Sequence, residues 1–421
     1  MCRRSHQGDS PVSETKISAL KSTASGATSR GAVLGAMFLM ATSAIGPGFI
    51  TQTASFTAKL GAAFAFAIVV SILVDIAVQL NVWRVIGISG ERAHILGNKV
   101  APGVGWALAA LVIVGGFVFN IGNVAGTGLG TNAMFGLDPK IGGAVSALIA
   151  ITIFLVKRAG VALDRIVIVL GALMIALMIY VAIVSDPPLG SALVNVVAPE
   201  KVDFLVITTL IGGTVGGYIT YAGAHRIVDA GLTGPENAGA ITRSSVIGIL
   251  VTGLMRILLF LAILGVVAGG VQLTGKNQAA DAFQAAAGDV GLRLFGIIFW
   301  AAAITSVIGA AYTSVSFMTK PATSDRTRNL LTVGFIAVSA TVFLVLPNGT
   351  TPQGLLIFAG AFNGLILPIG FTLVLWIAAR RRDLLGGYKY PMWLLAIGVT
   401  AWLLSLYMGY QAILGMGKLF T

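Results

Sequence analysis

Charged residues are scarce in this chain. They make up only 10% of its 421 residues, whereas hydrophobic residues make up 57%. Soluble domains carry about 25% charged residues, so this composition excludes a soluble enzyme. Long apolar runs recur along nearly the whole chain, and each could cross about 30 Å of hydrocarbon as a helix. The sequence therefore predicts a large multi-pass membrane protein, whose backbone is helical or buried wherever it lies at membrane depth.

Cysteine and catalytic motifs are equally scarce. The single cysteine, Cys2, excludes a disulfide framework and a cysteine metal cluster. The chain has no nucleotide-binding, His-Glu-x-x-His or hydrolase-elbow motif, so nothing in it supports coupled ATP hydrolysis. A membrane-embedded enzyme would need intramembrane acids, histidines or metal ligands, and this chain has few. We therefore expect neither an enzyme nor a cofactor.

The first 30 residues are polar and lack the apolar stretch of a signal peptide. We interpret residues 1–30 as a disordered cytoplasmic tail and residues 31–421 as a single transmembrane domain. The net charge is +12, but the basic residues are dispersed between apolar segments rather than gathered on one face. This distribution argues against nucleic acid as a partner and favours an explanation by membrane topology.

Eleven apolar segments are long enough to be transmembrane helices, which predicts an all-α integral membrane protein. Their approximate ranges are 33–58, 62–83, 104–134, 141–157, 162–184, 203–226, 243–270, 291–318, 328–346, 354–379 and 391–416.

The distribution of Lys and Arg sets the predicted orientation. With a cytoplasmic N-terminus, the inside segments hold 20 of the 27 Lys and Arg residues and the outside segments hold six, while Arg256 falls within a span. This asymmetry follows the positive-inside rule. The odd number of spans then places the C-terminus outside. We expect the inner (plasma) membrane of a bacterium, with the lipid bilayer as a partner; the oligomeric state is left open, and a monomer is compatible with the sequence.

Glycine and proline interrupt two of these segments. The stretch "GGTVGGY" (212–218) places four glycines inside span 6, where each costs about 1 kcal/mol relative to alanine in a helix. The stretch "SAIGPGFITQTASFTAKLG" (43–61) places Gly46-Pro47-Gly48 in span 1, followed by a run of hydroxyl and amide side chains. Such glycines could serve only close helix packing. The polar run and the match between spans 1 and 6 favour a binding site.

Spans 1 and 6 are the corresponding positions of two five-helix halves, which indicates an inverted repeat. The first repeat covers about 33–184, the second about 203–379, and an extra helix follows at 391–416. Interrupted segments at matching places in two halves are typical of secondary transporters that bind solute near the bilayer midplane. Broken backbone exposes N–H and C=O groups, and half-helix ends add partial charge. The expected substrate-binding residues on the breaks are Gly48, Thr51, Gln52, Thr53, Ser55, Thr214, Gly216, Gly217 and Tyr218.

The chain also resembles a known family. The stretch "FVFNIGNVAGTGLGTNAMFGLDPKIGGAVSALIAITIFLVKRAGVALDR" (117–165) is similar in spacing to spans 3–5 of the NRAMP (natural resistance-associated macrophage protein) metal transporters. The segments "GPGF" in span 1, "GGTVGGY" in span 6 and "NGLILPIG" (363–370) in span 10 fall where that family has its signatures. The resemblance covers roughly residues 30–415 and implies a LeuT-type fold, in a distant prokaryotic clade of the family.

The chain departs from the family at the site residues. Ordinary members bind Mn²⁺ or Fe²⁺ with an Asp-Pro-Gly-Asn motif in span 1, where this chain reads "ITQTASFT" (50–57). The Met-Pro-His of span 6 corresponds to residues 216–218, so the soft thioether is lost. The acidic pair that serves proton movement in span 3 corresponds to Asn120 and Asn123. Span 10 offers Asn363 near the site but no acid, and we add Asn363 to the expected substrate-binding residues.

These departures leave three functions open. Neutral amides, hydroxyls and half-helix N-termini predict a site for a small anion, such as bicarbonate or a small carboxylate. The family resemblance implies instead a divalent metal, Mg²⁺ or Mn²⁺, held largely hydrated, because hard cations normally need a carboxylate. A transporter-like sensor that moves no solute is the third. We expect alternating access without the family's metal ligands, and a small inorganic or organic ion as the partner.

Four residues are further candidates for the ion pathway or for coupling: Asn120, Asn123, Asp75 and His225. Asp75 in span 2 is a functional candidate because intramembrane acids are costly, but it could instead form a structural pair with Gln79 and Arg84. His225 could titrate near neutral pH, although a histidine at a helix end more often caps the helix. The intramembrane Arg256 could add positive potential to an anion pathway or extend to an interface.

Overall fold

The computed structural model describes residues 46–319, 323–347 and 349–416, and its regular elements are all helices. The predicted tail (1–30) and the first part of the predicted span 33–58 lie outside these residues. The helices are α2 (Pro47–Leu60), η1 (Gly61–Ala63), α3 (Phe64–Ser89), α4 (Ala93–Val100), α5 (Val104–Phe135), α6 (Pro139–Leu155), α7 (Lys157–Ser185), α8 (Leu189–Val197), α9 (Phe204–Thr214), α10 (Ile219–Asp229), η2 (Pro235–Asn237), α11 (Ala238–Ala268), α12 (Gln278–Met318), α13 (Asp325–Val345), α14 (Pro352–Arg380), η3 (Arg382–Leu385) and α15 (Met392–Met416).

Polar residues in the connections fix where several helices begin. The side chain of Asp138 accepts hydrogen bonds from the first amides of α6, and Asp203, Ser324 and Thr351 do the same for α9, α13 and α14. A proline occupies the first turn of α2, α6 and α14, where its missing N–H costs nothing. These local signals explain why apolar segments of similar composition start as separate helices.

The described residues contain eight helices long and apolar enough to cross a membrane, or nine if the bent pair α7–α8 counts as one span. The predicted number of eleven is therefore not confirmed by length and composition alone. The stretch Pro47–Ser89 counts once, although its 43 residues would extend about 65 Å, twice the hydrocarbon thickness. It contains Gly61, whose φ of 54° and ψ of −134° are not helical. The helix α6 is apolar, but at 17 residues it is shorter than the eight helices counted here.

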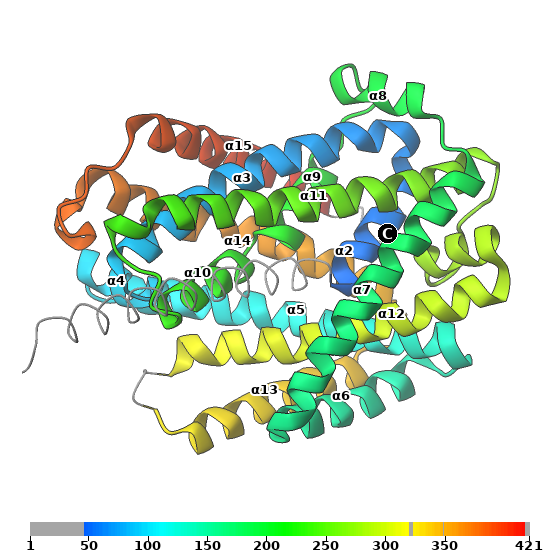
Figure 1. Ribbon diagram of the computed structural model, residues 1–421, viewed down its shortest axis with the longest axis horizontal. Coiled ribbons are helices and arrows are strands. Elements are labelled where there is room, and N and C mark those ends of the chain that lie inside the picture. The colour runs from blue at the N-terminus through cyan, green and yellow to red at the C-terminus, as the bar shows by residue number, and fades with distance from the viewer. Residues whose placement is uncertain (1–45, 320–322, 348, 417–421) are drawn as a thin grey trace, which may run out of the picture.

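The long helices lie side by side in one bundle, which α7 crosses obliquely (Figure 1). The third and fourth spans of the first repeat, α5 and α6, pack against their counterparts in the second repeat, α12 and α13. A short helix follows the second span of each repeat: α4 after α3, and the part of α12 before its kink at Gly288 after α11. The arrangement of the two halves therefore matches the predicted repeat.

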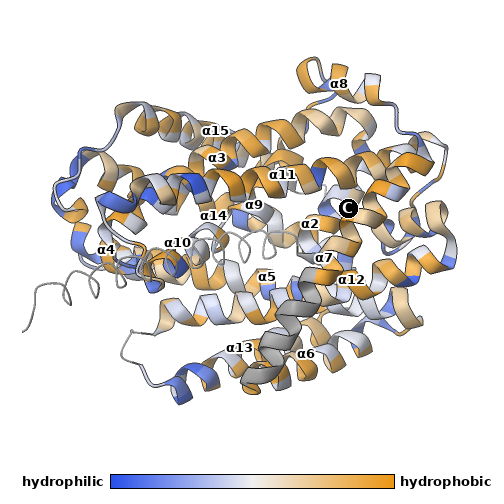
Figure 2. Ribbon diagram, in the orientation of Figure 1, coloured by the Kyte–Doolittle hydropathy of each residue, from blue (hydrophilic) through white to orange (hydrophobic). Residues whose placement is uncertain are grey.

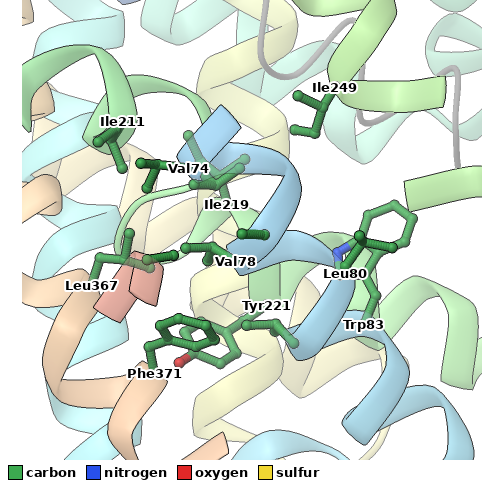
Figure 3. Close-up of a cluster of buried hydrophobic side chains, with 14 of the residues drawn as sticks. Val74, Val78, Leu80, Trp83, Ile211, Ile219, Tyr221, Ile249, Leu367 and Phe371 are labelled. Atoms are coloured by element: carbon green, nitrogen blue, oxygen red, sulfur yellow. The ribbon is translucent and has the colours of Figure 1, made fainter. Parts of the chain in front are cut away.

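The largest buried cluster of apolar side chains lies beside the break in span 6. Figure 3 shows Ile211 of α9 and Ile219 of α10, on either side of the break, with Val74 and Val78 of α3. Leu367 and Phe371 bring α14 to the same cluster. The interrupted segment is thus held between α3 and α14 rather than exposed to lipid.

Candidate functional site

The break in span 1 presents a buried helix N-terminus. The helix α2 begins at Pro47, and Gly46 before it is extended, with φ −82° and ψ −178°. Ile50 donates its amide to the Gly46 carbonyl at 3.3 Å. The amides of Gly48 and Phe49 precede the first intrahelical donor, so they have no acceptor within the helix. Both residues are buried, which places two N–H groups and the positive end of a helix dipole in the protein interior.

The polar run that follows is helical, which corrects part of the sequence interpretation. Residues 51–57 lie within α2, so their amides are used by the helix and only their side chains are available. The Thr53 hydroxyl donates to the Phe49 carbonyl at 2.8 Å. By contrast, the Thr51 and Ser55 hydroxyls and the Gln52 amide oxygen are buried without a hydrogen-bond partner in the described part of the chain. Thr53 is therefore the least available of the predicted side chains.

The break in span 6 falls where the glycines predict it. The helix α9 ends at Thr214, α10 begins at Ile219, and Gly217 between them has a φ of +51°. Two backbone amides at this break already have hydrogen-bond acceptors, because Val215 and Gly216 both donate to the Ile211 carbonyl at 2.9 Å. They are therefore not available to a solute. The Thr214 hydroxyl donates to the Leu210 carbonyl at 2.9 Å.

The glycines of this segment serve two different purposes. A Cβ at Gly212 would collide with the backbone of Gly360 and Gly364 on α14, and a Cβ at Gly216 would collide with Gly212 itself. These two positions are small because backbones approach closely, as the packing alternative predicted. Gly217 is different, because its positive φ is strained for any residue with a side chain. The motif therefore combines close packing at Gly212 and Gly216 with a break of the helix at Gly217, and its role in binding stays a prediction.

The side chain of Gln52 joins the two breaks. Its amide lies 3.8 Å from where a Cβ on Gly48 would stand, 2.5 Å from one on Gly213, and against Gly360 of α14. The Gln52 Nε2 donates weakly to the Leu356 carbonyl at 3.5 Å, which leaves the unpartnered Oε1 beside Gly213.

Asn363 closes the same region from α14. Its Nδ2 donates to the carbonyls of Gly115 on α5 at 3.1 Å and Ala359 at 2.9 Å, so its Oδ1 turns towards Gly217 without a partner. Both breaks, α5 and α14 therefore converge on two unpartnered amide oxygens.

Aromatic rings from α5 and the span 6 break also meet here. Phe119 stacks edge-on against Tyr218, with ring centroids 5.4 Å apart, and a Cβ on Gly48 would lie 3.5 Å from the Phe119 ring. Gly48 and Tyr218, predicted on separate spans, are thus neighbours of the same ring. Phe119 was not among the predicted site residues, because nothing in the sequence distinguishes one apolar residue from its neighbours in an apolar span.

Asn120 and Asn123 follow Phe119 on α5. Asn120 donates to the Ser339 hydroxyl of α13 at 3.3 Å, while its own oxygen and both amide atoms of Asn123 are buried without a partner in the described residues. Orphaned buried amides of this kind need an explanation such as bound water or solute. Their role in the ion pathway stays a prediction.

Asp75 and Arg256 form an open pair of opposite charges beside both breaks. The interpretation of Asp75 as a partner of Gln79 and Arg84 is wrong: Gln79 donates to the Ser245 carbonyl, Arg84 contacts Thr242 and Tyr388, and the cation that acts on Asp75 is Arg256. Arg256 does not extend to an interface either, since it is 2% exposed.

The surroundings of this pair tie it to the broken helices. The Arg256 guanidinium lies over the Phe49 ring, 4.4 Å from its centroid, in the first turn of α2. Asp75 lies within reach of the Thr214 hydroxyl at the end of α9. Arg256 is an intramembrane cation that was not among the predicted site residues. Of the Lys and Arg residues, Arg256 alone falls well inside a predicted span, and this position could have marked it as a site residue.

His225 is buried and acts as a cap, but for another helix. Its Nε2 accepts the amide of Ala93, the first residue of α4, at 3.1 Å, and its ring stacks on Phe317 at 4.4 Å. This contact joins the end of span 6 to the connection after span 2. His225 therefore lies away from the break, at one end of the bundle.

The chemistry of the site is set by neutral oxygens, hydroxyls, the Arg256 guanidinium and the Asp75 carboxylate beside it. Across the described residues, no group of three or more His, Cys, Asp or Glu side chains is placed to hold a metal ion. The arrangement can donate hydrogen bonds from Arg256 and the first turn of α2, and it can accept them at Gln52 and Asn363.

Comparison with known proteins agrees with this architecture. The structure of a mutant manganese transporter from Eremococcus coleocola superposes with a TM-score of 0.72 at 15% identity, covering 91% of this chain and 86% of that one. The LeuT-fold protein MhsT in complex with L-phenylalanine superposes with a TM-score of 0.65 at 18% identity, covering 90% of this chain and 98% of that one. These likenesses establish the LeuT-type fold.

Two curated relatives are much closer in sequence. The uncharacterized membrane protein YcsG of Bacillus subtilis (strain 168) is 50% identical over 379 residues, which is 90% of this chain and 93% of that protein. An uncharacterized membrane protein of Haemophilus influenzae is 51% identical over 366 residues, covering 87% and 91% of the two chains. The family model described as natural resistance-associated macrophage protein-like matches residues 37–415. The chain therefore belongs to the Nramp family of membrane transporters.

Proposed function

We propose that this protein is a secondary transporter that carries a small anion by alternating access. The observation that carries the proposal is the buried Arg256 guanidinium, whose Nε and Nη2 have no hydrogen-bond partner in the described residues, set against the first turn of α2. A buried cation is costly unless a partner compensates it. An anion at the break would accept hydrogen bonds from the guanidinium and from the amides of Gly48 and Phe49.

The oxygens of Gln52 and Asn363 narrow the choice of anion. Because both accept hydrogen bonds and neither has a donor, a solute that fills the site should carry an O–H or N–H group as well as a negative charge. Bicarbonate has both groups, and so does a small carboxylate with a hydroxyl or amide substituent. The site therefore favours these solutes over a simple halide.

A divalent metal is the second candidate, and the same two oxygens favour it. Neutral oxygens are ligands of hard cations, and the superposed Eremococcus coleocola protein is a manganese transporter. Against this candidate stands Arg256, whose contact with Phe49 places its positive charge next to α2, although the Asp75 carboxylate offsets part of that charge. Two unit charges about 4 Å apart interact by about 4 kcal/mol at an effective dielectric constant of about 20.

The experiment compares fluxes of bicarbonate, L-lactate, Mn²⁺ and Mg²⁺ in proteoliposomes containing the wild-type protein or Gln52→Glu. This substitution keeps the shape of the side chain and adds a carboxylate between the two breaks, whereas Gly216→Asp would collide with the backbone of Gly212. We expect anion flux in the wild type and a loss of affinity approaching a thousandfold in Gln52→Glu.

A matched pair of variants tests whether the Thr51 hydroxyl contacts the solute, apart from any effect of the substitution on folding. Thr51→Val removes a hydroxyl that has no partner in the described residues, and Thr53→Val removes one bonded to its own helix. We expect Thr51→Val to raise the KM about two- to tenfold and Thr53→Val to leave it nearly unchanged. Wild-type flux of Mn²⁺ or Mg²⁺ that increases in Gln52→Glu would contradict the anion proposal, and a sensor would move none of the four ions.

A further inference from the structure

The open pair of Asp75 and Arg256 also bears on how transport is coupled, an inference that rests on the proposed anion transport. The two side chains are 1% and 2% exposed, and Arg256 is the cation whose field acts on Asp75. Yet no nitrogen–oxygen contact of 4.0 Å or less joins them within the described part of the chain. The Asp75 Oδ1 and two guanidinium nitrogens are left without hydrogen bonds there. A purely structural ion pair is expected to close this gap, because an open buried pair gains little from its attraction.

The gap faces the two discontinuous helices. Arg256, on α11, reaches the start of α2 through Phe49, and Asp75, on α3, reaches the end of α9 through Thr214. The helix α11 packs on both α2 and α3, and α3 packs on α9. Arg256 therefore approaches the interrupted span 1 and Asp75 the interrupted span 6, the two segments at which an anion would bind.

Other ionisable groups do not compensate Asp75. Arg256 of α11 and the neutral Thr214 of α9 are the side chains that act on Asp75. The titratable side chains of α10, which are Tyr218, Tyr221 and His225, do not act on it. The remaining ionisable side chains of the surrounding helices lie towards the helix ends, as in the ion pair of Lys59 with Asp203.

We propose that Asp75 takes up a proton when an anion binds to Arg256, so that the protein is an electroneutral proton–anion symporter. In the empty site, the aspartate and the guanidinium sum to zero charge. Binding of a monovalent anion would leave the buried site with one uncompensated negative charge, which is very costly. A proton on Asp75 restores neutrality: one proton and one anion enter, and the same two leave on the other side.

The first test uses the wild-type protein in proteoliposomes with radiolabelled L-lactate as the probe, and protein-free liposomes correct for passive entry of the acid. A proton gradient of one pH unit should drive about tenfold accumulation of the transported anion, since a one-to-one symporter equates the two gradients. A membrane potential set with potassium and valinomycin should leave this accumulation unchanged. Anion flux without proton flux, or flux driven by the potential, would overturn the coupling and leave anion transport standing.

The second test uses Asp75→Asn, which imitates the protonated side chain. We expect anion exchange to persist with an affinity independent of pH, whereas the wild-type affinity should fall about tenfold per unit as the pH rises above the titration of Asp75. The control is Asp138→Asn, which removes a distant carboxylate while keeping the cap of α6, and it should retain the wild-type pH profile.

The outcomes separate the two proposals. If a proton gradient still drives accumulation of the anion by Asp75→Asn, Asp75 is not the coupling group, although the anion proposal holds. If the wild type moves Mn²⁺ or Mg²⁺ and no anion, the proposed function itself fails. Arg256→Gln should abolish anion flux in either coupled or uncoupled form, and anion flux that persists in it would remove Arg256 from the site.

Discussion

Gly217 combines two constraints that exclude any other residue. Its φ of +51° lies in the left-handed region, and a Cβ there would collide with the Oδ1 of Asn363. Left-handed backbone costs a residue with a side chain about 1–2 kcal/mol before any collision is counted.

We therefore expect Gly217→Ala to lower the thermal stability of the detergent-purified protein and to abolish transport. The measurement is the unfolding temperature beside the flux in proteoliposomes. The matched control is Gly334→Ala, in the middle of α13, where a Cβ meets nothing within 4 Å and alanine favours the helix. Equal behaviour of the two variants would show that the span 6 break is not conformationally specified by Gly217.

Single residues also show what the sequence predicts and what it leaves open. The breaks at Pro47 and Gly217 follow from the backbone preferences of proline and glycine, which are local and visible in the string. The partner of Asp75 cannot be predicted from local preferences, because it depends on which faces of α3 and α11 turn towards each other. Thr53 is a weaker candidate than the sequence indicates for a related reason, since its hydroxyl donates to the carbonyl four residues back.

Two ion pairs hold opposite ends of the broken helices. Lys59 at the end of α2 bonds Asp203 at the start of α9 at 2.8 Å. Arg92 at the start of α4 bonds Asp229 at the end of α10 at 3.0 Å and the Ser316 carbonyl near the end of α12 at 3.0 Å. In a transporter that alternates access, one of these links must open whenever the site faces its side.

We expect Arg92→Ala to favour opening at the α4 end and Lys59→Ala to favour opening at the other end. A loss of about 1 kcal/mol shifts the population about fivefold. The measurement is thiol labelling of Ser55→Cys from each side of the membrane, with Cys2 replaced by serine. Lys99→Ala, which breaks a partly exposed pair between α4 and Glu91 just before it, is the control; labelling that changes equally in all three variants would contradict the assignment.

Elements outside the spans were the hardest to predict. The short helix α8 (Leu189–Val197) was not expected, and it bends by 106° from α7. Nine residues between two spans carry too little periodicity to distinguish a helix from a loop. By contrast, the polar, alanine-rich connection near 271–290 indicates a short surface helix, and the structure has one there, which begins at Gln278 and ends at the kink of Gly288. Its N-cap, Asn277, is a local signal of the kind that α8 lacks.

At the scale of the whole molecule, three contacts join connections that the predicted topology places on the same side of the membrane. Lys140, at the start of α6, bonds the carbonyls of Leu344 and Leu346, at the end of α13. Lys59, at the end of α2, bonds Asp203, at the start of α9. The predicted topology places the connections at all four of these helix ends outside. Arg381 bonds the Lys99 carbonyl, in connections that were both assigned to the inside. Figure 2 shows hydrophilic residues gathered at the bundle end that carries α4. Composition and spacing predict this two-sided layout because it depends on segment order, not on side-chain contacts.

The number of crossings is a property of the whole chain that a fusion experiment can decide. The last helix, α15, has 25 residues and would extend about 37 Å, which suffices to cross a bilayer. Arg380, Arg381 and Arg382 precede it, and such a cluster holds its connection in the cytoplasm. If the N-terminus is also cytoplasmic, a crossing by α15 makes the number of crossings odd, as in the predicted eleven, and the C-terminus lies outside.

Alkaline phosphatase fused after Thr421 should therefore be active in a bacterial host, and green fluorescent protein at the same place should be dark. Fusions after Lys389, between α14 and α15, should behave in the opposite way, because this connection carries the basic cluster. The pair of sites differs by one helix, so it isolates the crossing by α15 from every earlier span. A fluorescent fusion at both positions would mean that α15 lies on the membrane rather than across it, and that an even number of crossings returns the chain to the side where it began.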